Sequence, residues 1–212
     1  MYKHPLLDRD KMTPKEALDI LLEGNRRFES NLASHKDMQT LVQLTKDKQH
    51  PFASVLSCSD SRAPVEMLFD QALGDVFSVR LAGNVASTLA IGSLEFSTKY
   101  LGSKLVVVLG HTSCGAVKAA CDDFKGGHIG ELISYIRPSV RESHFAVQDQ
   151  NSGNNDFVQE ICELSVKLQI RQIISSSDII YEMLDKKQIG IVGGVYDIAT
   201  GKVKLLENTI NV

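Results

Sequence analysis

The sequence has little of what marks several large classes of protein. Its formal net charge is only −3 over 212 residues, so it lacks the basic surface that binds nucleic acid or an anionic membrane. No apolar run reaches the roughly 18 residues of a membrane-spanning helix. The first five residues, MYKHP, lack the apolar core of a secretory signal. We therefore expect a cytoplasmic protein without nucleic-acid or membrane partners, although a chain trimmed of a leader would look the same.

Cysteine is also scarce. Four cysteines in a chain of this length are too few for a scaffold held by disulfides. In a chain without a leader, metal binding or simple burial is the more typical use of such residues. The hydrophobic share of 43% is enough for the packed core of one domain.

From Phe52 onward, short apolar runs alternate with helical patterns. The runs do not alternate between polar and apolar residues, which favours strands buried on both faces of a parallel sheet. Strands that alternate with helices indicate an α/β domain. The expected strands are 52–57, 75–83, 104–111 and 188–197, and the expected helices are 86–101, 113–122 and 155–187 with a break near 175–177.

The two ends of the chain differ from this alternating pattern. Residues 13–30 predict a helix, because Thr13 and Glu16 match a capping box and Pro14 fits the first turn. A second helix is expected at 36–48, and a hairpin at 196–206 predicts a last, antiparallel strand.

These patterns together predict a single α/β domain. We expect a central, mostly parallel sheet with flanking helices and a C-terminal antiparallel edge strand. Residues 1–48 form a helical arm and residues 49–212 the α/β core, with an exposed polar loop at 146–157.

Two short motifs carry the chemistry. CSDSR (58–62) follows the first expected strand, and GHTSCG (110–115) overlaps the end of the third. The carboxyl ends of parallel strands share one edge of a sheet, where ligand sites form. Cys58, Cys114 and His111 should therefore meet, and thiolate sulfur with imidazole nitrogen is a typical ligand set for zinc.

Asp60 leaves the type of zinc site open. As a fourth ligand it would make the site structural. Arg62, two residues later, offers a guanidinium fork that can hold the carboxylate away from the metal. Zinc lowers the pKa of a bound water toward 7, so an open position would provide hydroxide for hydration or hydrolysis of a small electrophile.

Other uses of the cysteines fit less well. A cysteine phosphatase needs a longer loop than the three residues between Cys58 and Arg62, and no C-x-x-C redox pair occurs. Cys121 lies two helical turns after Cys114, about 10 Å along the axis, so we expect it and Cys162 to be structural.

The two motifs resemble the signature of the β-carbonic anhydrases, and FDQALGDVFSVRLAGN (69–84) resembles the segment between them. The similarity extends from about Gln49 to Cys121. It implies zinc-dependent reversible hydration of CO2 to bicarbonate and a proton. Cys58, His111 and Cys114 would bind Zn2+, and Asp60 and Arg62 would form a catalytic dyad, with Asp60 a possible fourth ligand in a closed state.

The resemblance also implies substrate contacts and partners. The residues that it assigns to the substrate pocket are Gln49, Phe77, Ala82, Gly83 and Phe96. Family members form dimers or dimers of dimers, with sites at the dimer interface and the N-terminal helix on the partner subunit.

The chain has no tryptophan, and Val55 stands where one subgroup has the tryptophan of an allosteric bicarbonate pocket. The plant-like, non-allosteric subgroup is therefore favoured. Two alternatives stay open from the sequence. One is a hydrolase of carbon disulfide or carbonyl sulfide on the same scaffold, and the other is a non-catalytic zinc protein.

Overall fold

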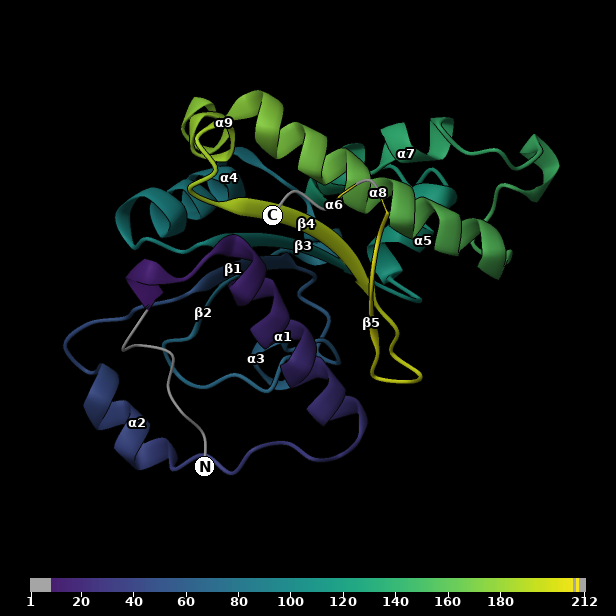
Figure 1. Cartoon of the computed structure of the whole chain (residues 1–212). Coiled ribbons are helices and arrows are strands. Elements are labelled where there is room, and N and C mark those ends of the chain that lie inside the picture. The colour runs from purple at the N-terminus through teal and green to yellow at the C-terminus, as the bar shows by residue number, and fades with distance from the viewer. Residues whose placement is uncertain (1–8, 208, 210–212) are drawn as a thin grey trace.

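The structure, a computed structural model, describes residues 9–207 and residue 209. The N-terminal MYKHP segment lies outside these residues. A five-stranded sheet with the order β2-β1-β3-β4-β5 forms the centre (Figure 1). Its strands are β1 (Ala53–Ser57), β2 (Val76–Arg80), β3 (Leu105–His111), β4 (Gly190–Tyr196) and β5 (Val203–Leu205).

The strand directions confirm the predicted fold class. β1 pairs in parallel with both β2 and β3, and β3 pairs in parallel with β4. β5 pairs antiparallel with β4 after a tight turn at residues 197–202. The carboxyl ends of β1 and β3 therefore lie side by side.

Side chains alternate between two apolar layers, one on each face of the sheet. Leu56, Val108 and Ile191 face the layer covered by the helices from α4 to α9. Val55, Val107 and Val192 face the layer covered by α1 and α3. Burial on both faces is why these strands are apolar without alternation.

The described helical elements are η2 (Arg9–Lys11), α1 (Pro14–Glu29), α2 (Met38–Thr45), α3 (Val65–Leu68), η3 (Ala82–Asn84), α4 (Thr88–Glu95), the π-helix η4 (Phe96–Tyr100), α5 (Gly115–Cys121), α6 (Gly127–Ser134), α7 (Arg137–Arg141), η5 (Val147–Asp149), α8 (Asn155–Ser176) and α9 (Asp178–Asp185). The capping box of Thr13 and Glu16 is present at the start of α1. Ser177 separates α8 from α9 and caps α9, so the predicted break is confirmed. Within the described part of the chain, no helix has both the length and the apolar character needed to span a membrane.

Several helices differ from the sequence-based prediction. The helix expected at 86–101 starts at Thr88 and changes from α to π geometry at Phe96. The short helices α6 and α7 were not predicted, because each is at most eight residues long and gives too little helical periodicity to detect.

Close packing of α8 on the sheet depends on glycine. A Cβ on Gly110 would lie 2.8 Å from Val166 and 3.0 Å from the sulfur of Cys162. A Cβ on Gly193 would lie 2.8 Å from Val166 as well. These positions let α8 press against the backbone of β3 and β4, and so against the strand that ends at His111.

Candidate metal centre

The two motifs meet at the carboxyl edge of the sheet, as the sequence predicts. Cys58 directly follows β1, His111 is the last residue of β3, and Cys114 precedes α5. Their ligand atoms all lie within 4.8 Å of one another and all three residues are buried. The two sulfur atoms are 3.9 Å apart. Three donors thus converge on one point from two adjacent strand ends.

The hydrogen bonds of His111 leave one ring nitrogen for a metal. Its Nδ1 lies 2.9 Å from the carbonyl oxygen of Thr112, to which it donates as an N–H. Among the residues that the structure describes, its buried Nε2 has no hydrogen-bond partner. A ligating histidine usually donates its second nitrogen to a carbonyl or carboxylate. The tautomer of His111 therefore fits a metal at Nε2.

The two sulfur atoms also fit a cation. The hydrogen bond from Cys114 lowers the pKa of Cys58, while the same bond and burial raise the pKa of Cys114. Two thiolates this close repel each other unless positive charge lies between them. A divalent cation provides that charge, and a set of two sulfurs and one imidazole nitrogen suits zinc.

Asp60 points to Arg62 and lies at the margin of the centre. Arg62 donates from Nε to Asp60 Oδ1 at 2.9 Å and from a terminal nitrogen to Oδ2 at 2.7 Å. The side-chain hydrogen bond from Arg62 lowers the pKa of Asp60 well below its usual range. Oδ2 is still only 3.8 Å from Nε2 of His111. The carboxylate is therefore ionised, held by Arg62, and close enough to bind a group at the centre.

The turn η3 supplies a backbone donor to the centre. The N–H of Gly83 points to the sulfur of Cys58 at 3.3 Å. Gly83 has a φ of +68°, and a Cβ there would lie 2.6 Å from Ile136. Glycine is therefore required both by the backbone conformation and by the close approach of α6–α7. Gly83, which the resemblance assigns to the substrate pocket, thus contacts Cys58, and Ala82 precedes it in the same turn.

The other two cysteines lie outside the ligand cluster. Cys121 is the last residue of α5, and burial raises its pKa to about 12. Burial likewise raises the pKa of Cys162 to about 12. The Cys162 thiol lies 3.3 Å from the carbonyl oxygen of His111 and donates to it. Both are neutral thiols at physiological pH, which agrees with a structural role.

Three predicted substrate residues lie away from the metal ligands of their own chain. Gln49 is exposed and precedes β1, while Cys58 follows β1, so the five-residue strand separates them by about 17 Å. Phe77 pairs with Ser54, which is about 13 Å along the strand from Cys58. Phe96 packs beside Phe77 with a ring distance of 6.3 Å. The structure brings these two rings together but not to their own chain's centre.

A family model described as carbonic anhydrase matches residues 53–203, which include every residue of this centre. The chain belongs to the carbonic anhydrase family. A carbonic anhydrase of Mycolicibacterium smegmatis is 35% identical over 202 residues, which cover 91% of this chain and 93% of that protein. Carbonic anhydrase 2 of Mycobacterium tuberculosis is 32% identical over 205 residues, covering 94% and 96%.

Similarity to solved structures shows which class of carbonic anhydrase the chain belongs to. The β-carbonic anhydrase of Coccomyxa, determined with acetazolamide, has a TM-score of 0.70 and 31% identity, covering 89% of this chain and 86% of its own. One of two tetrameric β-carbonic anhydrases of Sordaria macrospora has a TM-score of 0.72 and 25% identity, covering 90% and 96%. This carbonic anhydrase is thus of the β class, and its reaction is the reversible hydration of CO2.

Sequence reasoning missed three contributors to the centre of this carbonic anhydrase. They are the carbonyl of Thr112, the thiol of Cys162 and the guanidinium of Arg80, which contacts the loop after β1. The lone arginine at the end of an otherwise uncharged strand was a signal for Arg80. The other two contacts depend on chain packing and leave no pattern in the sequence.

Proposed function

We propose that Cys58, His111 and Cys114 bind one Zn2+ and that CO2 is hydrated beside it. The observation that carries this proposal is the pairing of a three-donor cluster with a carboxylate that Arg62 holds at its margin. Three protein ligands and one open position are typical of catalytic zinc, whereas four are typical of structural zinc. Zinc would lower the pKa of water at the centre, so that hydroxide is available near neutral pH.

Four residues around the ligand cluster have separate roles in the proposed reaction. Asp60 accepts a hydrogen bond from the attacking oxygen and orients it, because its carboxylate is ionised and faces the centre. Arg62 keeps that carboxylate from becoming a fourth ligand by forming two hydrogen bonds with it. The Gly83 N–H stabilises the negative charge on the Cys58 sulfur. Thr112 orients His111 through its carbonyl group.

The functional unit that we propose is a homodimer or a dimer of dimers. β2 is an edge strand, and its residues are mostly half-buried. Phe96, 46% exposed, packs against Phe77 of β2 and stacks on Tyr100, 78% exposed. Leu89, 83% exposed, lies on α4, which contacts β2. An unpaired strand beside exposed aromatic side chains favours association with a second copy.

Dimerisation gives a role to the residues that lie far from their own centre. Gln49, Phe77 and Phe96 are too distant from the ligands of their own chain but lie near the β2 edge or the start of β1. We assign them to the substrate pocket of the second copy, where the two rings provide an apolar wall for uncharged CO2. Ala82 and Gly83 serve the centre of their own chain.

We further propose the non-allosteric, plant-like subgroup and a cytoplasmic location. Val55, which stands where the allosteric subgroup has tryptophan, is completely buried in the layer beneath α1. The proposed domain organisation remains a single domain with a helical arm at 1–48 and a core at 49–212. Helix α1 supports the single domain because Ala17, Leu18 and Leu21 join one of its two core layers.

Stopped-flow CO2 hydration by protein with a measured zinc content tests the proposed function. We expect one zinc per chain, activity that rises with pH, and inhibition by acetazolamide, which the Coccomyxa protein binds. Carbon disulfide and carbonyl sulfide serve as comparison substrates on the same preparation. Fast turnover of either one without CO2 hydration, or zinc-loaded protein that is inactive on all three, would contradict the proposal.

A further inference from the structure

Arg80 is a charged residue near the centre to which the proposed mechanism gives no role. It ends β2, where it pairs with Ser57 of β1, the residue before the ligand Cys58. Its side chain is half-buried and reaches over the end of β1. Nε donates to the carbonyl oxygen of Cys58 at 3.1 Å, and a terminal nitrogen donates to that of Asp60 at 2.7 Å.

These two hydrogen bonds bracket the loop that carries both a metal ligand and the catalytic carboxylate. Two donors in one rigid plane fix orientation as well as position, which a single donor cannot do. The other bonds to the loop backbone are a 3.3 Å bond from the N–H of Ser59 to the carbonyl oxygen of Leu81 and a turn bond from Ala63 to Asp60. Gly83 and Arg62 bind its side chains instead. Among the described residues, no ion pair joins Arg80 to a carboxylate. Its guanidinium is therefore committed to the loop.

We propose that Arg80 is a positioning residue that holds the Cys58–Asp60 loop with Asp60 turned toward Arg62 and away from the metal. This inference rests on the proposed function of the same centre. Oδ2 of Asp60 is 3.8 Å from Nε2 of His111, so a short movement of the loop would bring the carboxylate to the ligand cluster. Arg80 opposes this movement by holding the backbone of the loop, while Arg62 opposes it by holding the side chain of Asp60.

A double-mutant cycle tests this role. Arg80→Ala should lower kcat for CO2 hydration by about tenfold or more, with KM nearly unchanged and zinc retained. In an Asp60→Asn background, the same substitution should lower kcat by less than about twofold, because no carboxylate remains to be misplaced. Arg80→Lys keeps the charge but loses the planar fork, and should recover only part of the lost activity.

Hydrogen exchange provides a readout that does not depend on activity. The amide of Ser59 donates to Leu81, and the amide of Arg62 donates to Oδ1 of Asp60 at 2.9 Å. Both amides should exchange faster in Arg80→Ala than in the parent, while amides of β3 stay unchanged. If the protein proves inactive toward CO2, this local change still tests the positioning role, so failure of the two proposals can be told apart.

Arg137→Ala is the matched control. Arg137 also donates from a terminal nitrogen to a carbonyl, that of Phe124 at 2.7 Å, but outside the centre. We expect it to leave kcat and the exchange of Ser59 unchanged. Equal losses of kcat from Arg80→Ala in both backgrounds, or unchanged exchange at Ser59 and Arg62, would overturn the proposal. If Arg80→Ala does not fold, the same cycle with Arg80→Lys decides between the same outcomes.

Discussion

The four cysteines differ in what surrounds their sulfur atoms. Cys58 receives a hydrogen bond from the N–H of Gly83 and lies 3.9 Å from Cys114. Cys121 and Cys162 lie in apolar surroundings that raise each pKa to about 12. Only Cys58 and Cys114 can both become thiolates at physiological pH, because a cation bound between them would stabilise the two negative charges.

Cys58→Ser or Cys114→Ser should therefore abolish zinc binding, since a neutral hydroxyl group is a much poorer ligand than a thiolate. Zinc content per chain after dialysis measures the effect. Cys121→Ala is the control and should keep one equivalent of zinc. Zinc retained by the serine variants, or lost from Cys121→Ala, would show that the ligand set is assigned incorrectly.

Arg62→Ala should reduce kcat for CO2 hydration by roughly a hundredfold or more while zinc remains bound. Without its two hydrogen bonds, Asp60 is free to occupy the open ligand position. Arg171→Ala, which removes an exposed guanidinium bound to Glu142 at 2.9 Å, is a control that should retain full activity. Normal turnover by Arg62→Ala would contradict the role given to the Asp60–Arg62 pair.

Arg62 also affects how kcat depends on pH. Arg62 lowers the pKa of Asp60 below its ordinary value of 3.8, so the carboxylate stays ionised at every pH above about 4. We therefore expect a rise of kcat between about pH 6 and 9 to come from ionisation of water at the centre and not from Asp60. We expect Asp60→Asn to lower activity without removing this rise. A profile that becomes flat in Asp60→Asn would show that Asp60 itself titrates in this range.

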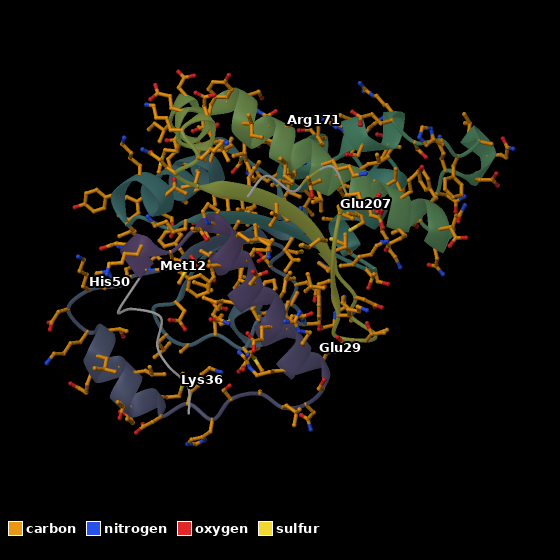
Figure 2. All side chains as sticks on the ribbon, viewed as in Figure 1. Met12, Glu29, Lys36, His50, Arg171 and Glu207 are labelled. Carbon is orange, nitrogen blue, oxygen red and sulfur yellow. The ribbon has the colours of Figure 1, made fainter. Side chains whose placement is uncertain are left out.

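At the scale of elements, Asp70 joins the segment between α1 and α2 to the core. Its side chain is only 1% exposed and accepts hydrogen bonds from Arg27 at 2.6 Å, from the N–H of Ser34 at 3.1 Å and from Lys36. Burial raises the pKa of Asp70, but the hydrogen bonds from Lys36 and Arg27 outweigh it and leave the pKa below 3.8. Lys36 lies on the side of α1 and α2, opposite α8 (Figure 2).

Asp70→Asn should lower the free energy of unfolding by roughly 3 kcal/mol at pH 7, because it leaves two cations without their shared carboxylate. A lowered pKa in the folded state means that this contribution is complete above about pH 4 and is lost as the pH falls through the folded-state pKa. Urea unfolding at pH 7 and at a pH below the folded-state pKa of Asp70 measures this contribution and its loss. Asp19→Asn, in an exposed pair with Lys15, should cost less than about 1 kcal/mol. Equal stability losses in the two variants would contradict the assignment.

At the scale of the whole molecule, the strip of Phe77, Phe96 and Tyr100 is where we propose that a second copy associates. The rings of Phe96 and Tyr100 are 5.0 Å apart and stacked, beside an edge strand to which no further strand of the described chain is paired. Exposed aromatic side chains around an open edge are typical of an interface. The substrate pocket proposed above is complete only if this edge meets another copy.

Tyr100→Lys should weaken self-association by about tenfold or more, because it places a charge in an apolar contact. Sedimentation equilibrium measures the dissociation constant. Tyr181→Lys is the matched control, since Tyr181 is also an exposed aromatic residue but lies on α9, and it should leave association unchanged. A parent protein that is monomeric at micromolar concentration, or a Tyr100→Lys variant that associates normally, would exclude this edge as the interface.

The sequence by itself determined most of the regular elements and the three residues that converge at the centre. Period and capping predicted α1 from Thr13, and apolar runs predicted four strands, of which β1, β3 and β4 are buried on both faces. CSDSR and GHTSCG predicted that Cys58, His111 and Cys114 meet, because parallel strands end at one edge. These features are local, so each depends on residues within a few positions of one another.

Only the tertiary structure decided how the centre is held in place. Arg80 reaches the Cys58–Asp60 loop from a neighbouring strand, and Cys162 reaches His111 from a helix 51 residues away. It also showed that Gln49 and Phe77 lie too far along the sheet to serve the centre of their own chain. Such contacts depend on strand order, register and the close approach of α8 over Gly110. Long-range packing sets all three, and it leaves no periodic pattern in the sequence.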